Sequence, residues 1–222
     1  AVRGFIWGNQ GRKGQILCAR EFMNSLIDSS FTEVAGAIQS YEWLSDYYDV
    51  GERYIRSKDG NIEFTFAGLR RNLDSIKSRA RILLCWVDEA ETVSSMAWDK
   101  LLPTVREENS EVWVSWNPES KLSATHQRFR VDTPNDCRIT EMNWRDNPYF
   151  PQVLEKQRME DFEKRPQSYD HIWEGNFLTF HDGAYYSVEM RDANAEGRIT
   201  SVPYERAAPV ITAWDLGVGD ST

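Results

Sequence analysis

Short apolar runs alternate along the chain with segments whose apolar residues recur at the spacing of a helix. The run 82–87 is continuously apolar, which is typical of a strand buried on both faces of a parallel sheet. Segment 24–48 places apolar side chains at intervals of about three and four, which indicates one broken helix or two helices. Strands that alternate with helices in this way predict an α/β fold with a mainly parallel sheet flanked by helices.

The same periodicities, together with turn residues, predict the remaining elements. The Asp59-Gly60 pair separates two alternating segments and indicates a β-hairpin, because glycine adopts the positive φ that the turn requires. Further strands are predicted over 16–19, 54–56, 62–66, 111–116, 138–142 and 210–214. Further helices are predicted over 1–7, 94–102, 124–129, 151–164 and 167–174, with Pro103 and Pro166 as breaks.

Composition and charge exclude several classes of protein. The 222 residues carry a net charge of −9, from 26 Lys and Arg against 35 Asp and Glu. The 41% of hydrophobic and 27% of charged residues are typical of a soluble globular chain rather than a disordered one. No apolar stretch approaches the about 20 residues of a transmembrane helix, so we expect no membrane partner. The start lacks both a signal-peptide run and an initiator Met, which suggests a fragment.

The cysteines and histidines indicate neither disulfides nor a zinc site. Cys18, Cys85 and Cys137 are an odd, widely spaced set without a CxxC pair, and three histidines show no metal-ligand spacing. We therefore expect a reducing, cytosol-like compartment.

A shift in composition over 177–206 separates two parts of the chain. Turn-rich sequence there interrupts the regular pattern, and the apolar run 210–214 then begins another strand. We therefore predict a first domain over 1–176, a linker over 177–206 and the start of a second domain over 207–222.

Two local clusters of basic residues stand out against the acidic balance. Segment 70–81 contains five Arg and Lys residues and one acid, and a second cluster comprises Lys121, His126, Arg128 and Arg130. Such a cluster is either a solvated face or a surface that contacts nucleic-acid phosphates. The pattern alone favours the solvated face.

The strongest chemical signal is the apolar run that ends in Asp88 and Glu89. Ligands of open α/β sheets bind at the carboxyl ends of the strands, where an Asp can hold Mg²⁺ and the next Glu can orient and deprotonate a water. This is the pattern of a Walker B element. A strand that merely ends in two acids is the alternative.

A second strand carries polar residues at the same predicted edge. Ser115 and Asn117 follow the apolar part of 111–116 and precede Pro118, so that a hydroxyl and an amide could sense a γ-phosphate. An ordinary turn built on Asn117 is the alternative.

Several blocks, in this order, resemble one family, the large terminase subunit of tailed double-stranded DNA bacteriophages. They are Ile-Leu-Cys-Ala-Arg-Glu-Phe (16–22), Phe-Ala-Gly-Leu-Arg-Arg-Asn (66–72), Ser-Ile-Lys-Ser (75–78), Cys-Trp-Val-Asp-Glu-Ala-Glu (85–91), Leu-Pro-Thr-Val-Arg (102–106), Ser-Trp-Asn-Pro (115–118), Asn-Trp-Arg-Asp-Asn-Pro (143–148) and Trp-Glu-Gly (173–175). The resemblance covers nearly the whole chain.

The resemblance implies a P-loop ATPase of the ASCE type, which uses ATP and Mg²⁺ to drive DNA into the procapsid, joined to a ribonuclease-H-like nuclease. By position, Asp88 matches the Mg²⁺-binding Walker B carboxylate, and Glu89 matches the catalytic glutamate. Ser115 and Asn117 match the nucleotide-sensing coupling motif. Asp215 matches the first metal-binding and catalytic aspartate of the nuclease, on that domain's opening strand.

The same resemblance implies partners and a location. Double-stranded DNA, the small terminase subunit and the portal protein of the procapsid are the expected partners. The expected assembly is a homo-oligomeric ring in the bacterial host cytoplasm, docked transiently on the procapsid.

The sequence also departs from the family pattern. No G-x-x-x-x-G-K-[ST] occurs, since Gly8 to Gly14 does not supply that order of residues. The resemblance places the phosphate loop just upstream of residue 1, and the remaining nuclease carboxylates beyond residue 222. We therefore expect these 222 residues alone to bind ATP poorly and not to hydrolyse it.

Three interpretations follow from these observations. The leading one is a DNA-packaging motor, in which Arg20, Arg70, Arg71 or Arg79 is the candidate arginine finger and DNA contact is the rival role for such residues. Another ASCE ATPase, such as a helicase-like protein, is the second interpretation. A catalytically defective prophage remnant that only binds partners is the third.

Overall fold

The chain divides into two units, Ala1–Thr179 and Phe180–Thr222. The computed structural model describes residues 1–22, 27–70, 81–178, 186, 189–190, 193, 196–201 and 207. Nearly all of this description belongs to the first unit, which contains every strand described below. Within the described part of the chain, every helix is too short or too polar to span a bilayer.

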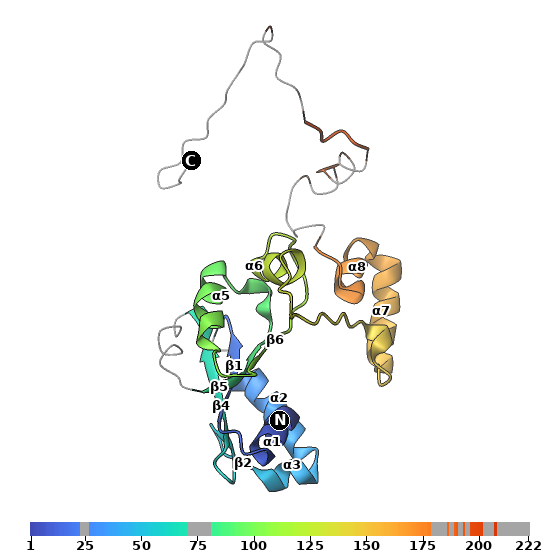
Figure 1. The fold of residues 1–222 in the computed structure, drawn as a ribbon. Helices are drawn as coiled ribbons and strands as arrows, with labels where there is room; N and C mark the ends of the chain where they lie inside the picture. The colour runs from blue at the N-terminus through green and yellow to red at the C-terminus, as the bar shows by residue number, and fades with distance from the viewer. Residues whose placement is uncertain are drawn as a thin grey trace, which may run out of the picture. The chain divides into compact units, whose positions relative to one another are not determined.

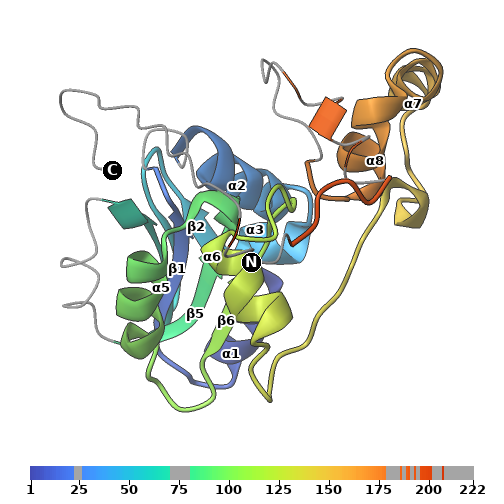
Figure 2. The ribbon, with the colours of Figure 1, turned by 90° about the horizontal axis from the view of Figure 1, so that it is seen from above.

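A sheet forms the centre of the first unit (Figures 1 and 2). Its described strands lie in the order β2-β3-β4-β1-β5-β6. Their bounds are β1 (Gly14–Arg20), β2 (Tyr48–Val50), β3 (Ile55–Ser57), β4 (Ile62–Gly68), β5 (Ile82–Val87) and β6 (Glu111–Val114). Strands β4, β1, β5 and β6 are parallel, whereas β2 and β3 are antiparallel to their neighbours. The prediction of an α/β fold with a mainly parallel sheet is therefore confirmed.

The antiparallel edge is built by the predicted hairpin. The turn between β3 and β4 contains Gly60 at φ 71°, a left-handed conformation that glycine adopts without a steric penalty. Asp59 stabilises the turn by accepting hydrogen bonds from the Asn61 backbone N–H (3.0 Å) and the Ser57 hydroxyl (2.5 Å). The short strand β2, which the sequence pattern did not indicate, pairs with β3 beyond this hairpin.

Alternate residues of the central strands pack on opposite faces of the sheet, as the two-residue period of a strand requires. In β1, Ile16 and Cys18 belong to one buried cluster, whereas Leu17 and Ala19 belong to the other. Strand β5 contains an irregularity opposite Gln15 and Ile16, because their partners are Ile82 and Leu84. The extra residue explains why Leu83 and Leu84 both join the same cluster.

Helices cover both faces of the sheet (Figure 2). One face is covered by α1 (Val2–Asn9), α2 (Thr32–Gln39) and α3 (Glu42–Tyr47), and the π-helical turn η1 (Ile27–Phe31) leads directly into α2. These helices contribute Trp7, Val34, Ile38 and Leu44 to the buried cluster on that face. The predicted helix over 1–7 and the broken helix over 24–48 are thus confirmed for the described residues.

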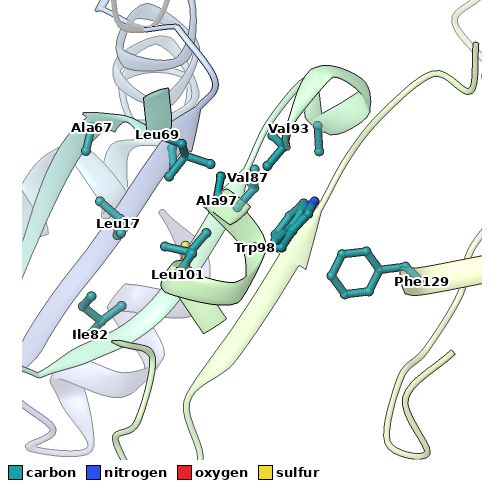
Figure 3. Close-up of a cluster of buried hydrophobic side chains, with 13 residues drawn as sticks. Leu17, Ala67, Leu69, Ile82, Val87, Val93, Ala97, Trp98, Leu101 and Phe129 are labelled. Atoms are coloured by element: carbon teal, nitrogen blue, oxygen red, sulfur yellow. The ribbon is translucent and has the colours of Figure 1, made fainter. Parts of the chain in front are cut away.

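The other face is covered by α5 (Ser95–Leu101), which the turn η2 (Ala90–Thr92) precedes and the turn η3 (Leu102–Thr104) follows. The Ser94 hydroxyl caps α5 by accepting from the Ala97 backbone N–H. Trp98 is fully buried and packs edge-on against Phe129, with ring centroids 5.0 Å apart (Figure 3). The predicted helix over 94–102 is confirmed, and Pro103 lies in the turn after it.

Two further groups of helices follow β6. The first is α6 (Ala124–His126), which continues as the π-helical turn η4 (Gln127–Val131). The second comprises the turn η5 (Trp144–Asp146), α7 (Gln152–Lys164) and α8 (Pro166–Glu174), whose first residue is the predicted break Pro166. The side chain of Asp161, buried in α7, accepts a hydrogen bond from the Trp173 indole of α8 (3.0 Å) and so joins the two helices.

The predicted strand over 138–142 is wrong. The segment pairs with no described strand, and all of its side chains are exposed. Its two apolar residues, Ile139 and Met142, are both exposed, so the segment has no buried face.

Other predictions lie outside the described residues. They concern the strand 210–214 with Asp215, the residues Arg71 and Arg79, and the expected start of a nuclease domain at 207–222, of which only residue 207 is described. The division into 1–176, 177–206 and 207–222 stays a prediction.

Candidate functional site

The candidate site lies where four parallel strands end. Strands β4, β1, β5 and β6 have their carboxyl ends at the same edge of the sheet, which is where ligands of open α/β sheets bind. Arg20 is the last residue of β1, Asp88 follows β5, and Ser115 follows β6. Three of the residues that the sequence suggested for catalysis or binding are therefore neighbours at this edge.

Backbone hydrogen bonds fix the positions of Asp88 and Ser115 relative to the neighbouring strands. The Asp88 N–H donates to the Ala19 carbonyl (2.9 Å), and the Ser115 N–H donates to the Val87 carbonyl (3.0 Å). The sheet hydrogen bonding thus continues one residue beyond β5 and β6. These main-chain bonds place Asp88 between the end of β1 and the residue that follows β6.

Side chains from three elements surround the Asp88 carboxylate. An Arg20 guanidinium nitrogen lies 2.7 Å from Oδ2, and the Ser115 hydroxyl donates to Oδ1 at 3.0 Å. The buried Ser30 hydroxyl of η1 makes a longer and weaker hydrogen bond to Oδ2, at 3.4 Å. The Trp86 indole N–H donates to the Ser115 oxygen at 3.0 Å, so that the Ser115 proton is left to point at Asp88.

Glu89 is held by its backbone in an uncommon conformation. Its φ of 48° and ψ of 48° lie in the left-handed region, which few residues other than glycine adopt. The next residue, Ala90, donates its N–H to the Ser115 carbonyl at 3.0 Å, which fixes the turn. The Glu89 side chain is 69% exposed and meets Arg20 at 3.0 Å. Its carboxylate is thus open to solvent while one oxygen is paired.

Arg20 bridges both acids. Its side chain is only 9% exposed, and a single guanidinium nitrogen contacts Asp88 and Glu89. Its Nε has no hydrogen-bond partner among the described residues. Of the four arginines suggested as a finger, Arg20 is thus a partner of the acids within its own chain. Arg70, the other candidate that is described, follows β4 and lies over the Phe22 ring.

Asn117 is not brought to Asp88. It is exposed, and its side chain makes no hydrogen bond with any described residue. The structure therefore unites Asp88, Glu89 and Ser115 but leaves Asn117 two residues further along an open loop.

The donor set around Asp88 suits a hard cation. One carboxylate and the Ser115 hydroxyl offer oxygen atoms, and Mg²⁺ in nucleotide sites is held by one or two carboxylates together with phosphates and waters. Among the described residues, no group of three or more His, Cys, Asp or Glu side chains could hold a metal ion without such help. The residues present therefore fit a Mg²⁺ that arrives with a nucleotide.

The second basic cluster is largely neutralised. Arg128 pairs with Asp99, Arg130 pairs with Glu141, and Lys121 lies over the Phe177 ring. These contacts favour a solvated, internally paired face for this cluster.

Sequence reasoning missed three participants at this edge, namely Ser30, Trp86 and Glu91. Glu91 accepts hydrogen bonds from the backbone of Glu119 and Ser120. The acid-rich turn after β5 was visible in the sequence, but no local pattern shows which loop an acid will meet.

A mainly parallel sheet with adjacent acids at the end of one strand, and a polar residue at the end of the next, is the arrangement of the Walker B edge in P-loop NTPase domains. A family model described as phage terminase large subunit matches residues 5–176. The chain belongs to this family. No curated protein sequence matches it.

Solved structures share the fold at low sequence identity. The large terminase of a thermophilic bacteriophage, in complex with ATP-gamma-S, aligns with a TM-score of 0.57 and 12% identity, over 78% of this chain and 42% of that one. The bacteriophage HK97 large terminase gives 0.52 and 10%, over 75% and 40%. A mutant ATPase domain of the Thermus phage P74-26 large terminase gives 0.51 and 13%, over 79% and 81%.

The share of each aligned protein that is covered shows where the similarity lies. The chain spans about two fifths of the first two terminases but most of the separate P74-26 ATPase domain. The predicted P-loop fold is confirmed, and it is the fold of the terminase ATPase domain.

Proposed function

We propose that this chain is the ATPase part of a viral motor that moves double-stranded DNA into a procapsid. The observation that carries the proposal is the position of Asp88 and Glu89 beside Ser115 at the carboxyl edge of the sheet. The complexes of the thermophilic bacteriophage's terminase with ADP and ATP-gamma-S support ATP as the nucleotide. Membership of the terminase family favours packaging over a helicase-like role.

Each residue has a distinct part in the proposed reaction. Asp88 would hold the Mg²⁺ of Mg·ATP, which would supply positive charge to offset that of the phosphates. Glu89 orients the attacking water and accepts its proton, a role for which its exposed carboxylate is suited. Ser115 keeps Asp88 oriented through its hydrogen bond. Ser115 and Asn117 would together sense the γ-phosphate of a bound nucleotide, as the matching motif of the family implies.

The wider activity belongs to the whole protein. We propose that Asp215 binds metal in a nuclease that cuts concatemeric DNA. The proposed partners are the small terminase subunit, the portal protein and further copies of the chain in a ring. Packaging would take place in the host cytoplasm on a docked procapsid.

The test compares Glu89→Gln with the unchanged protein, in a form that also carries a phosphate-binding loop. A neutral amide cannot accept the proton, so kcat for ATP hydrolysis should fall about 100-fold or more. The Kd for ATP-gamma-S should stay within about threefold. Glu108→Gln, at an exposed acid whose carboxylate makes no hydrogen bond or ion pair with the described residues, is the matched control.

Two results would contradict the proposal. A large loss of nucleotide binding in Glu89→Gln would argue against a role limited to the chemical step. Unchanged hydrolysis would exclude Glu89 as the base. For the 222 residues alone, which contain no G-x-x-x-x-G-K-[ST], we propose negligible hydrolysis, and Mg²⁺-dependent turnover that Glu89→Gln abolishes would refute this.

A further inference from the structure

The carboxylate of Glu91, two residues after Glu89, accepts hydrogen bonds from the segment that follows β6. Its Oε1 accepts hydrogen bonds from the backbone N–H groups of Glu119 (3.0 Å) and Ser120 (2.8 Å). Its Oε2 accepts from the Ser123 hydroxyl (3.1 Å). Hydrogen bonds to a carboxylate are about twice as strong as those between neutral groups. One side chain therefore organises segment 119–123.

The preceding residue, Ala90, is anchored to the same region by its backbone. Its N–H donates to the Ser115 carbonyl (3.0 Å), and its carbonyl accepts from the Thr125 hydroxyl (2.5 Å). Thr125 is fully buried and accepts in turn from the Trp98 indole at 3.0 Å. The turn that carries Glu89 is thus bonded to both ends of the stretch 115–125.

Segment 119–126 also contacts Phe177 and Leu178, which lie just before the end of the first unit at Thr179. The Leu178 N–H donates to the Glu119 carbonyl at 2.9 Å. The Phe177 ring packs edge-on against His126, with centroids 4.9 Å apart, and the Lys121 ammonium lies 5.5 Å from the same ring. Glu119 therefore uses its N–H to meet Glu91 and its carbonyl to meet Leu178.

We propose that Glu91 is a positioning residue that ties the Asp88–Glu89 turn to segment 119–123 and, through that segment, to Phe177 and Leu178. A displacement of the turn is then transmitted to the point from which the chain continues into the second unit. The use of this link during ATP turnover rests on the proposed function, whereas the link itself does not.

Amide hydrogen exchange in the 222-residue chain, without nucleotide, tests the link independently of catalysis. In Glu91→Ala, the amides of Glu119 and Ser120 should exchange about tenfold faster or more, because their acceptor is gone. The decisive amide is that of Leu178, which does not touch Glu91 yet should also lose protection. Amides of β1 and β5 should keep theirs.

Two further variants separate positioning from general damage. Glu91→Gln keeps an acceptor for both backbone N–H groups and gains a donor for the Ser123 oxygen, so it should restore most of the protection. Glu119→Ala changes the same loop at a side chain without contacts among the described residues, and it should leave the three amides as they are.

The reverse perturbation covers the case in which Glu91→Ala does not fold. Phe177→Ala removes the ring contacts with His126 and Lys121, and coupling between sites is reciprocal. The amides of Glu119 and Ser120 should then exchange faster. The inference is overturned if Leu178 stays fully protected in Glu91→Ala, or if Phe177→Ala leaves both loop amides unchanged.

Discussion

Arg20 lies 2.7 Å from Asp88 and 3.0 Å from Glu89, so that one guanidinium pairs with two adjacent carboxylates at the end of β5. The arginine is almost entirely buried, whereas Asp88 is partly and Glu89 largely exposed. A buried charge loses its hydration and is tolerated because the partners replace it. The three charges therefore stabilise the edge as a set.

Removing this cation should destabilise the fold. Arg20→Met keeps much of the buried stem but leaves two neighbouring acids uncompensated, and we expect a loss of about 2 kcal/mol in the free energy of unfolding. Urea denaturation measures it, and an unchanged m-value would show that the native state is still formed. In Arg56→Met, which removes an exposed pair with Asp49, the loss should stay below about 1 kcal/mol. Equal losses in both variants would contradict this account.

The Ser115 hydroxyl should be detectable through Trp86. In Ser115→Ala the indole N–H of Trp86 loses its acceptor, so its proton resonance should move upfield and exchange faster with water. Asp88 loses a donor as well, and stability should fall by about 1 kcal/mol. Two-dimensional ¹⁵N NMR follows the indole signal. Ser110→Ala, at a hydroxyl without contacts among the described residues, should leave that signal in place, and an unmoved signal in Ser115→Ala would refute the contact.

The buried carboxyl of Glu21 should make the stability of the fold depend on pH. Burial raises the pKa of its carboxyl above the ordinary value of 4.5, although attraction to Arg70 opposes the shift. A raised pKa means that ionisation favours unfolding, so the stabilisation is complete below the unfolded pKa and is lost as the pH rises through the folded pKa. Glu21→Gln should therefore be more stable than the unchanged chain at pH 7.

That advantage should shrink toward zero as the pH falls to 4.5 and below. Chemical denaturation of both proteins at several pH values gives the difference in their free energies of unfolding. A Glu21→Gln variant less stable at pH 7 than at pH 4.5, each relative to the unchanged chain, would reverse the sign and contradict the prediction.

Thiol reactivity should distinguish the three cysteines. Burial raises the pKa of Cys18 to about 12 and also raises that of Cys85, and both thiols are inaccessible, whereas Cys137 is exposed. Because the thiolate is the reactive form, an aromatic disulfide reagent at pH 8 should modify one thiol quickly in the native chain and all three in denaturant. Cys137→Ser should remove the fast phase. Fast modification of two thiols would show that the sheet core is open.

The elements that the sequence could predict are those whose pattern is local. Strand β5 is bounded as its apolar run indicates, because burial on both faces leaves no polar position within it. The segment 138–142 contains two apolar residues but meets no neighbouring strand among the described residues, and pairing is a property of the whole sheet. Strand β2 was missed for the converse reason, since three residues form a strand there only because β3 lies beside them.

The site follows the same division. Asp88 and Ser115 could be placed at one edge because parallel strands end there, and in the structure the Ser115 hydroxyl donates to Asp88. The pairing of Arg20 with both acids could not be predicted, because it depends on the register of β1 against β5. The hydrogen bonds between Glu91 and segment 119–123 depend on how that segment returns to the turn after β5, which the sequence does not reveal.

The left-handed backbone at Glu89 has a consequence for evolution and design at that position. Holding a residue with a β-carbon in this conformation costs on the order of 1 kcal/mol relative to glycine. A glycine would therefore relax the main chain while deleting the carboxylate that we propose as the catalytic base, so that stability and the proposed activity would favour different residues at this position.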